Sequence, residues 1–226
     1  MRQQYLGVLM TNLRLCYQTL EFGDIDIHLC TLRDKQQFYD QQGIAKNLGI
    51  SSASWPFFGV LWPSGLVLAH LMHDYDTGAK RILEIGCGMA ISSLLLNKKC
   101  ADITATDYHP EVEKFLRRNT LLNEGKVIAF ERVAWGDNND SLGLFDLIIG
   151  SDLLYEDDHV KLVADFIEKH AKPVCEVMVV DPGRGRKNKL SSRMMKFGFS
   201  CNHHKPHRTD DYLEKKFDGH ILKFKR

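Results

Sequence analysis

The stretch Ile82-Leu83-Glu84-Ile85-Gly86-Cys87-Gly88 decides the fold of this chain of 226 residues. A short apolar strand runs into two glycines, and a helical pattern follows over residues 90–96. Glycine lets the backbone turn tightly and lets a ligand approach it closely. A strand, a glycine turn and a helix in this order indicate a loop that binds a nucleotide-like cofactor at the edge of a parallel sheet.

Strand and helix patterns alternate around this loop. Before it, residues 63–75 predict a helix, because Pro63 suits a first helical turn and apolar residues recur at helical spacing. The remaining pattern predicts helices over residues 110–122, 158–170 and 190–197, and strands over residues 80–85, 102–106, 127–135, 145–151, 174–180, 199–205 and 220–225. This alternation predicts an α/β fold, with a mostly parallel seven-stranded sheet, helices on both faces and a final antiparallel pair.

Residues 1–54 are predicted to form an N-terminal arm, separate from a domain of residues 55–226. In the arm, residues 24–29 alternate between polar and apolar, which is typical of a strand, and we expect a hairpin with residues 14–19. A polar run over residues 35–40 and a loop over residues 47–54 separate this hairpin from the domain.

The composition is ordinary for a soluble globular protein, with 44% hydrophobic and 26% charged residues. A net charge of +1 predicts no strongly basic face, so nucleic acid is not the expected partner. We find no apolar run of about 18 residues, so no membrane span is expected. The six cysteines include no Cys-x-x-Cys pair, which predicts free thiols in the cytoplasm and no metal site.

A carboxylate follows the glycines at the distance expected for a ribose-binding residue. Asp107 ends the next strand, about twenty residues further on, where it can accept hydrogen bonds from both ribose hydroxyls. The third glycine of a dinucleotide loop is missing, and the acidic Glu84 stands before the turn. Both details favour S-adenosyl-L-methionine over NAD. Alternatively, Asp107 forms the turn before Pro110, and Glu84 is a surface carboxylate at the strand end.

Four segments resemble a known family, the seven-strand lysine methyltransferases, which have the Rossmann-like class I fold. These enzymes modify proteins such as chaperones, calmodulin and the β subunit of electron-transfer flavoprotein. The most specific segment matches the Asp-x-x-Tyr signature after the fourth strand, and Asp181-Pro182-Gly183-Arg184 is similar to the flavoprotein-directed branch. The four segments, within a resemblance over residues 55–185, are Leu61-Trp62-Pro63-Ser64-Gly65, Glu84-Ile85-Gly86-Cys87-Gly88, Ala134-Trp135-Gly136 and Ser151-Asp152-Leu153-Leu154-Tyr155.

The resemblance implies a cofactor site and an acceptor site. Asp152 and Tyr155 are implied as the catalytic pair, which contacts the cofactor or the target nitrogen, and their spacing can place both on one side of a turn. The residues implied for binding S-adenosyl-L-methionine are Trp62, Glu84, Gly86, Gly88, Asp107, Tyr108, Trp135 and Ser151.

Other interpretations of these residues stay open. Trp62 and Trp135 could be buried for their apolar area alone, and Ser151 could fill a strand end. Asp152 could cap the helix that is predicted from residue 158, while Tyr155 packs against the sheet.

Methyl transfer from a sulfonium is an in-line displacement, which needs proximity, alignment and exclusion of water. A target lysine must first lose its proton from an amine with an unperturbed pKa of about 10.4. The first hypothesis is therefore a methyltransferase that acts on a lysine of a protein substrate. The alternatives are a protein histidine, a small amine or RNA as acceptor, or a binding module that keeps the fold without catalysis.

Two weaker patterns lie near the C-terminal end. A basic run follows the fifth strand, where it could dock an acidic protein or RNA, or form a solvated loop, and we expect Asp181 and Arg184 to pair. His203, His204 and His207 are interpreted as strand-edge residues, and His109 as a turn histidine. The basic residues are Arg184, Arg186, Lys187, Lys189 and Arg193.

Overall fold

The computed structural model describes residues 13–137 and 141–226. Its centre is a seven-stranded sheet of order β5-β4-β3-β6-β7-β9-β8. Neighbours from β5 to β7 run parallel, and β9 runs antiparallel to both β7 and β8. The predicted sheet is thus confirmed. Its strands are β3 (Arg81–Ile85), β4 (Asp102–Asp107), β5 (Ala129–Arg132), β6 (Phe145–Ser151), β7 (Ala171–Asp181), β8 (Ser200–His204) and β9 (His220–Lys225).

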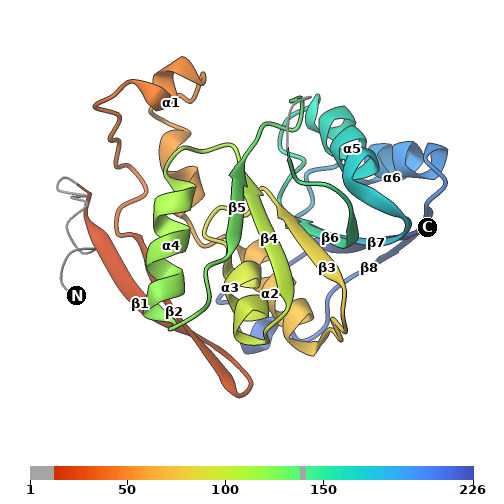
Figure 1. Ribbon diagram of the computed structural model, residues 1–226, viewed down its shortest axis with the longest axis horizontal. Helices are drawn as coiled ribbons and strands as arrows, with labels where there is room; N and C mark the ends of the chain where they lie inside the picture. Colours follow the sequence, from red (N-terminus) through yellow and green to blue (C-terminus); the bar gives the residue numbers. More distant parts are fainter. Residues whose placement is uncertain (1–12, 138–140) are drawn as a thin grey trace.

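Helices cover both faces of this sheet (Figure 1). One face packs against α2 (Pro63–Asp74), α3 (Ile91–Lys98) and α4 (Val112–Leu122), and the other against α5 (His159–His170) and α6 (Lys187–Lys196). Successive residues of a strand point to opposite faces. Leu147 and Ile149 therefore join the first core, and Ile148 joins the second. Burial on both sides explains why the strands are continuous apolar runs in the sequence.

Three short helical turns were not anticipated by the sequence pattern: α1 (Ile44–Asn47), η1 (Trp55–Gly59) and η2 (Thr209–Asp211). Within η1, Trp55 and Phe58 are buried and pack edge to face at 5.3 Å. The ring of His109 stacks on Phe58 at 4.2 Å. Burial lowers the pKa of His109 to about 3, so this histidine is a neutral member of an aromatic cluster rather than a solvated turn residue.

The N-terminal hairpin consists of β1 (Leu15–Phe22) and β2 (Ile25–Leu32), which pair antiparallel. It is longer than predicted, and Figure 1 shows it beside α4. Ile27, Leu29 and Cys30 of β2 are fully buried in the core that also contains α2, α3 and α4. Residues 1–12 of the predicted arm lie outside the described residues, and the boundary between residues 54 and 55 stays a prediction.

Two asparagines of α4 fix β2 to the domain. Asn119 accepts the backbone N–H of Cys30 at 2.7 Å and donates to its carbonyl at 3.3 Å. One turn later, Asn123 accepts the N–H of His28 at 2.8 Å and donates to its carbonyl at 2.7 Å. Four helical residues and two strand residues both span about 6 Å. The two amides therefore pair with the edge of β2 as a neighbouring strand would.

The segment Trp55–Asp74 is long and apolar enough to cross a membrane, by length and composition only. This differs from the expectation that no such run exists. In the structure the segment is divided between η1 and α2, with an extended break between them. Val67, Leu68 and Met72 of α2 are fully buried in the first core, and this burial accounts for the apolar character of the segment.

Replacing Asn119 with alanine is expected to lower the free energy of unfolding by about 2–3 kcal/mol, because the buried N–H of Cys30 loses its acceptor. Urea denaturation measures this change. The control is Arg117→Ala on the exposed side of α4, which should stay within about 0.5 kcal/mol of wild type. An equally small effect of Asn119→Ala would show that these hydrogen bonds do not hold the hairpin.

Candidate cofactor and acceptor site

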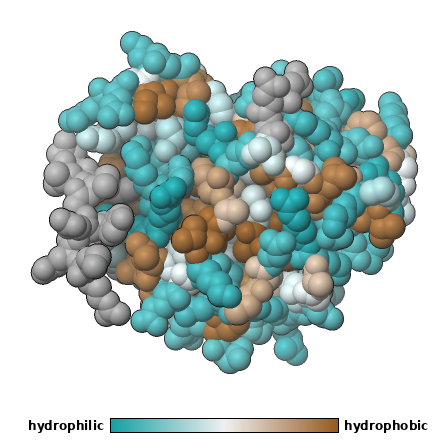
Figure 2. Space-filling model, in the orientation of Figure 1, coloured by the Kyte–Doolittle hydropathy of each residue, from teal (hydrophilic) through white to brown (hydrophobic). Residues whose placement is uncertain are grey.

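The carboxyl ends of β4, β3 and β6 lie side by side at the centre of the sheet. Because the three strands are parallel and in register, Gly86, Asp107 and Ser151 lie at the same level of this edge. The edge is also the switch point of the topology, where ligands bind in open α/β sheets. In Figure 2 the surface is indented between the part around α1 and the part that contains α5.

The turn after β3 requires left-handed backbone conformations. Gly86 has φ 61° and Gly88 has φ 50°. A Cβ atom at Gly86 would lie 2.8 Å from Cδ2 of Leu153, so a larger residue would displace that side chain. Ala90, with φ 54°, adopts the same conformation at the start of α3, although it carries a Cβ atom.

Asp107 ties together the two loops at this edge. Its Oδ2 accepts the N–H of Gly88 at 2.8 Å, and its Oδ1 accepts the N–H of His109 at 2.8 Å. Burial raises the pKa of Asp107, and the backbone N–H donors oppose this shift. Each carboxylate oxygen can accept a further hydrogen bond, so the geometry fits a residue that binds ribose hydroxyls.

Glu84 is buried, with 4% of its surface exposed, so it is not the surface carboxylate of the alternative interpretation. Its Oε2 accepts the backbone N–H of Ser93 at 3.0 Å and also the Ser93 hydroxyl. The carboxyl group therefore holds the first turn of α3 against β3. Burial raises the pKa of Glu84 to about 7, although the hydrogen bonds from Ser93 act against this shift.

Two predicted aromatic residues, Trp135 and Trp62, have different surroundings. The Trp135 ring lies beside the glycine turn, since its Cζ2 would be 3.3 Å from a Cβ atom at Gly86, and it meets His159 edge to face at 5.0 Å. Trp62 precedes α2, and its Nε1–H donates to the carbonyl of Phe57 at 3.0 Å. Both rings are partly exposed, so they are not simply core residues.

Tyr108 and Ser151 complete the predicted cofactor residues. The Tyr108 hydroxyl donates to the carbonyl of Leu48 at 2.8 Å, so it links the loop after β4 to the segment after α1. Ser151 ends β6, partly exposed, and its Oγ would lie 3.6 Å from a Cβ atom at Gly65. The structure thus gathers all the predicted cofactor residues at one edge or next to it, and their contacts with the cofactor stay predictions.

Asp152 does not cap α5, which begins after Asp158 without a side-chain cap. Its carboxylate instead forms a two-point ion pair with Arg184: Nε donates to Oδ1 and Nη2 to Oδ2, each at 2.9 Å. The expected pair of Asp181 with Arg184 is therefore wrong. Oδ2 of Asp181 accepts a hydrogen bond from the N–H of Gly183 at 3.1 Å. Oδ1 is buried and has no hydrogen-bond partner among the described residues.

Tyr155 is 53% exposed, so it does not pack against the sheet as the alternative interpretation required. Its ring meets His159 edge to face at 4.3 Å. Partial burial raises the pKa of Tyr155 to about 12, and the negative charges of Asp107, Glu156 and Asp152 contribute. The phenol is therefore protonated near neutral pH and can both donate and accept hydrogen bonds.

Several members of the basic run and of the histidine cluster have structural partners. Arg186 pairs with Asp157 at 3.0 Å, and Arg193 pairs with Asp165 at 2.5 Å. His203 contacts the Ser191 hydroxyl at 2.7 Å, next to the strand edge. Among residues 13–137 and 141–226, no three His, Cys, Asp or Glu side chains are placed to hold a metal ion.

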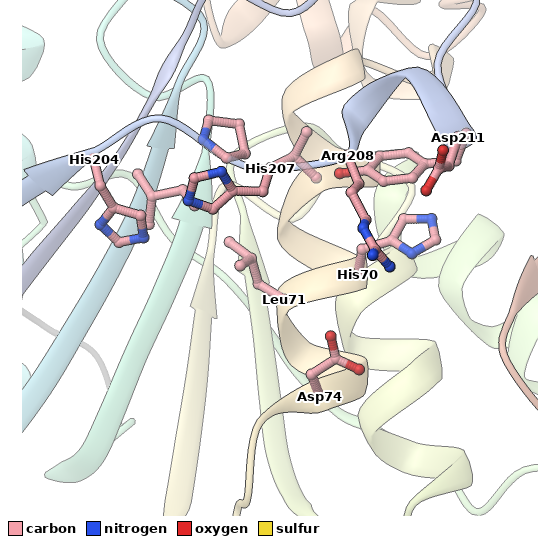
Figure 3. Close-up of a pocket in the computed structure, with 11 residues that line it drawn as sticks. His70, Leu71, Asp74, His204, His207, Arg208 and Asp211 are labelled. Carbon is pink, nitrogen blue, oxygen red and sulfur yellow. The ribbon is translucent and has the colours of Figure 1, made fainter.

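A cavity of about 420 Å³ lies away from this edge, between the second half of α2 and the segment that joins β8 to β9 (Figure 3). Its wall includes the stacked rings of His70 and Tyr212, 3.7 Å apart. Arg208 and His207 line it from the β8–β9 segment. None of its lining residues belongs to the predicted cofactor or acceptor residues.

Glu84→Gln is expected to change how stability depends on pH. Because the folded pKa of about 7 lies above the unfolded value of 4.5, the stability from protonated Glu84 is present below about pH 4.5 and is lost as the pH rises through 7. Glutamine stays neutral. The variant should therefore gain on the order of 2 kcal/mol relative to wild type between about pH 5 and 8, measured by urea denaturation. The control is Glu113→Gln, at an exposed position of α4. If Glu84→Gln raises the free energy of unfolding no more than this control does, the raised pKa of Glu84 is contradicted.

Asp107→Ala is expected to weaken the binding of S-adenosyl-L-methionine by roughly 1.5–3 kcal/mol, the scale of hydrogen bonds to a charged group. Isothermal titration calorimetry should show this as a rise in Kd of about tenfold to 150-fold. Asp102→Ala, at the exposed start of the same strand, serves as the control. Unchanged affinity in the Asp107 variant would place the cofactor elsewhere.

Solved structures share this fold. A 16S rRNA methyltransferase of Thermus thermophilus superposes with a TM-score of 0.63 at 12% identity, over 94% of this chain and 50% of that one. A methyltransferase of Pyrococcus furiosus gives a TM-score of 0.57 at 22% identity, over 82% of this chain and 96% of that one. These similarities confirm the Rossmann-like methyltransferase fold.

This chain spans about half of the length of two curated protein-lysine methyltransferases and most of the length of a histone-arginine methyltransferase. Protein N-lysine methyltransferase METTL21A of Danio rerio is 31% identical over 115 residues, which are 46% of this chain and 52% of that protein. Protein-lysine methyltransferase METTL21E of Bos taurus is 29% identical over 119 residues, 47% of this chain and 41% of that protein. Histone-arginine methyltransferase METTL23 of Homo sapiens is 25% identical over 152 residues, 63% of this chain and 80% of that protein.

The model of a family described as lysine methyltransferase matches residues 51–196, which is more than half of the chain. The matched region contains the glycine turn, Asp107 and the signature from Ser151 to Tyr155. The predicted cofactor, S-adenosyl-L-methionine, is confirmed with the family, and the chain belongs to the lysine methyltransferase family.

Proposed function

We propose that this protein transfers a methyl group from S-adenosyl-L-methionine to a lysine side chain of a protein. The observation that carries the proposal is the position of Asp152 and Tyr155 directly after β6, at the sheet edge that holds the glycine turn and Asp107. Membership of the family and the similarity to two protein-lysine methyltransferases support the same acceptor.

The residues at the edge fit the cofactor. The left-handed turn at Gly86 and Gly88 gives close access to the backbone, and Asp107 has capacity for two further hydrogen bonds from ribose hydroxyls. Trp135 lies beside this turn, where a flat apolar surface suits the adenine ring. When bound, S-adenosyl-L-methionine supplies the methyl group together with a sulfonium charge that disappears on transfer.

The acceptor residues align the amine rather than remove its proton. Tyr155 is protonated near neutral pH, because its pKa is raised to about 12, so it offers a hydrogen-bond acceptor and a donor. The Asp152 carboxylate, mostly shielded from solvent, offers acceptor oxygens at a fixed position. A neutral amine that donates to these oxygens has its lone pair directed away from them. Alignment of this kind is the main requirement of an in-line displacement.

A cytoplasmic location and a protein partner are part of the same proposal. All six cysteines are free thiols, which suits a reducing compartment. The basic side chains Arg186 and Arg193 at the rim pair with carboxylates of this chain, so they offer little free positive charge to an RNA backbone. We therefore favour a protein over RNA as the substrate.

Asp152→Ala is expected to lower methyl transfer by about a hundredfold, because the amine loses its fixed acceptor. The measurement incubates the protein with tritiated S-adenosyl-L-methionine and a cell extract, separates the proteins on a gel and maps the label by mass spectrometry. The matched control is Asp158→Ala, which removes a carboxylate that makes no capping hydrogen bond at the start of α5. Cofactor affinity should stay within about twofold in both variants.

Each other outcome points to a different activity. Label on arginine or histidine would show that the acceptor is not lysine. Label confined to RNA or small molecules would exclude a protein substrate. Absence of transfer despite measured cofactor binding would favour the non-catalytic binding module. A wild-type rate in Asp152→Ala would show that Asp152 does not take part in the reaction.

A further inference from the structure

The ion pair between Asp152 and Arg184 differs from the other ion pairs at this rim. The Asp152 side chain is only 12% exposed, whereas the Asp157 side chain, which pairs with Arg186, is 79% exposed. The guanidinium of Arg184 meets both oxygens of Asp152 in the two-point geometry that gives the stronger charge-assisted pairs. The Arg184 side chain is 41% exposed, so the shielded partner is the carboxylate, and the two-point geometry holds the pair more firmly than a single contact would.

The backbone fixes both partners of this pair. Asp152 has φ 55°, in the left-handed region, and its N–H donates to the carbonyl of Val180 at 2.9 Å. On the other side, Asp181 accepts the N–H of Gly183, and Arg186 donates to the carbonyl of Arg184 at 3.3 Å. The loop is thus anchored on both sides of Arg184, which directs the guanidinium to the acceptor carboxylate.

A free carboxylate at this position would oppose the chemistry. The target lysine reacts only as the neutral amine, and a negative charge nearby stabilises its protonated form instead. A carboxylate beside the amine therefore helps only if its charge is balanced. Arg184 provides that balance in the structure, and its hydrogen bonds to Asp152 raise the pKa of Arg184 further, so the guanidinium stays charged.

We propose that Arg184 is a positioning residue for methyl transfer, which balances the charge of Asp152 and leaves its carboxylate as a hydrogen-bond acceptor for the target amine. The proposal rests on the proposed lysine methyltransferase function. A carboxylate has about four lone-pair sites, and the guanidinium takes two, so sites remain for an amine N–H. The ammonium first loses its proton to solvent, and the amine lone pair then forms the new N–C bond while the S–C bond of the donor breaks.

Other charged groups also act on an amine held here. The carboxylates favour its protonated form, and Arg186 acts on it less directly than Arg184 does, because it pairs with Asp157 and not with Asp152. Asp181 from β7 interacts with both Asp152 and Arg184, and Arg186 from the start of α6 donates to the Arg184 carbonyl. Tyr155, from the segment after β6, interacts with Asp152 and also with Asp107 from β4 and with Glu156. Arg184 is the cation that contacts Asp152 directly.

The test measures the initial rate of methyl transfer between about pH 6.5 and 10. The probe is the lysine-containing protein band that wild type labels in the extract. In Arg184→Met, the pH at which the rate reaches half of its plateau should move alkaline by about one unit, and the plateau should stay within about threefold of wild type. Arg184→Lys keeps the positive charge, so the pH of half-maximal rate should move by less than half as much as in Arg184→Met. The control Arg193→Met breaks the ion pair with Asp165 between α6 and α5. It should leave the pH of half-maximal rate unchanged.

Two results for folded Arg184→Met, judged by unchanged affinity for S-adenosyl-L-methionine, would overturn the proposal. One is a profile that coincides with wild type. The other is a loss of activity that persists at the alkaline end, because the amine is deprotonated there without help. If the wild-type protein labels no lysine at any pH, the proposed function is wrong, and the role of Arg184 that rests on it is wrong as well. If the wild-type protein labels lysine and only the variants depart from the expected profiles, the role of Arg184 alone is wrong.

Discussion

The turn between β3 and α3 depends on carboxylates that accept backbone N–H groups. Asp107 accepts the N–H of Gly88, and buried Glu84 accepts the N–H of Ser93 in the first turn of α3. The backbone is left-handed at Gly86, Gly88 and Ala90, and of these Ala90 is the residue whose Cβ atom makes the conformation costly. The Asp107 contact joins the turn after β3 to the end of β4, and both acids lie at the predicted cofactor edge. Fold and site therefore rest on one set of contacts.

Most of the fold could be predicted from local pattern, because strands buried on both faces must be apolar runs. The strand at Phe145–Ser151 has its predicted bounds, and the sheet has the seven predicted strands. The short turn η1 could not be predicted in this way. Its residues Trp55 and Phe58 are held by packing against His109, which is more than fifty residues away in the sequence. The apolar segment Trp55–Asp74 is not predicted as one run either, because its apolar residues are divided between two elements.

The candidate site was predictable where it follows strand ends and not where it depends on long-range polar pairs. Gly86 follows β3, and Asp107 and Ser151 end the neighbouring strands β4 and β6, so parallel pairing is sufficient to bring them together. The choice of Asp152 as partner of Arg184 depends on the left-handed conformation of Asp152, which sequence spacing does not reveal. For Asn119, a signal was present: a polar residue in the buried phase of an amphipathic helix needs a buried partner.

A crystal structure with S-adenosyl-L-homocysteine tests the site most directly. The geometry predicts both ribose hydroxyls within hydrogen-bond distance of the Asp107 carboxylate, the adenine beside Trp135, and the sulfur directed toward Asp152 and Tyr155. Homocysteine and ribose bound instead in the cavity between α2 and the β8–β9 segment, or a ribose that makes no contact with Asp107, would contradict it.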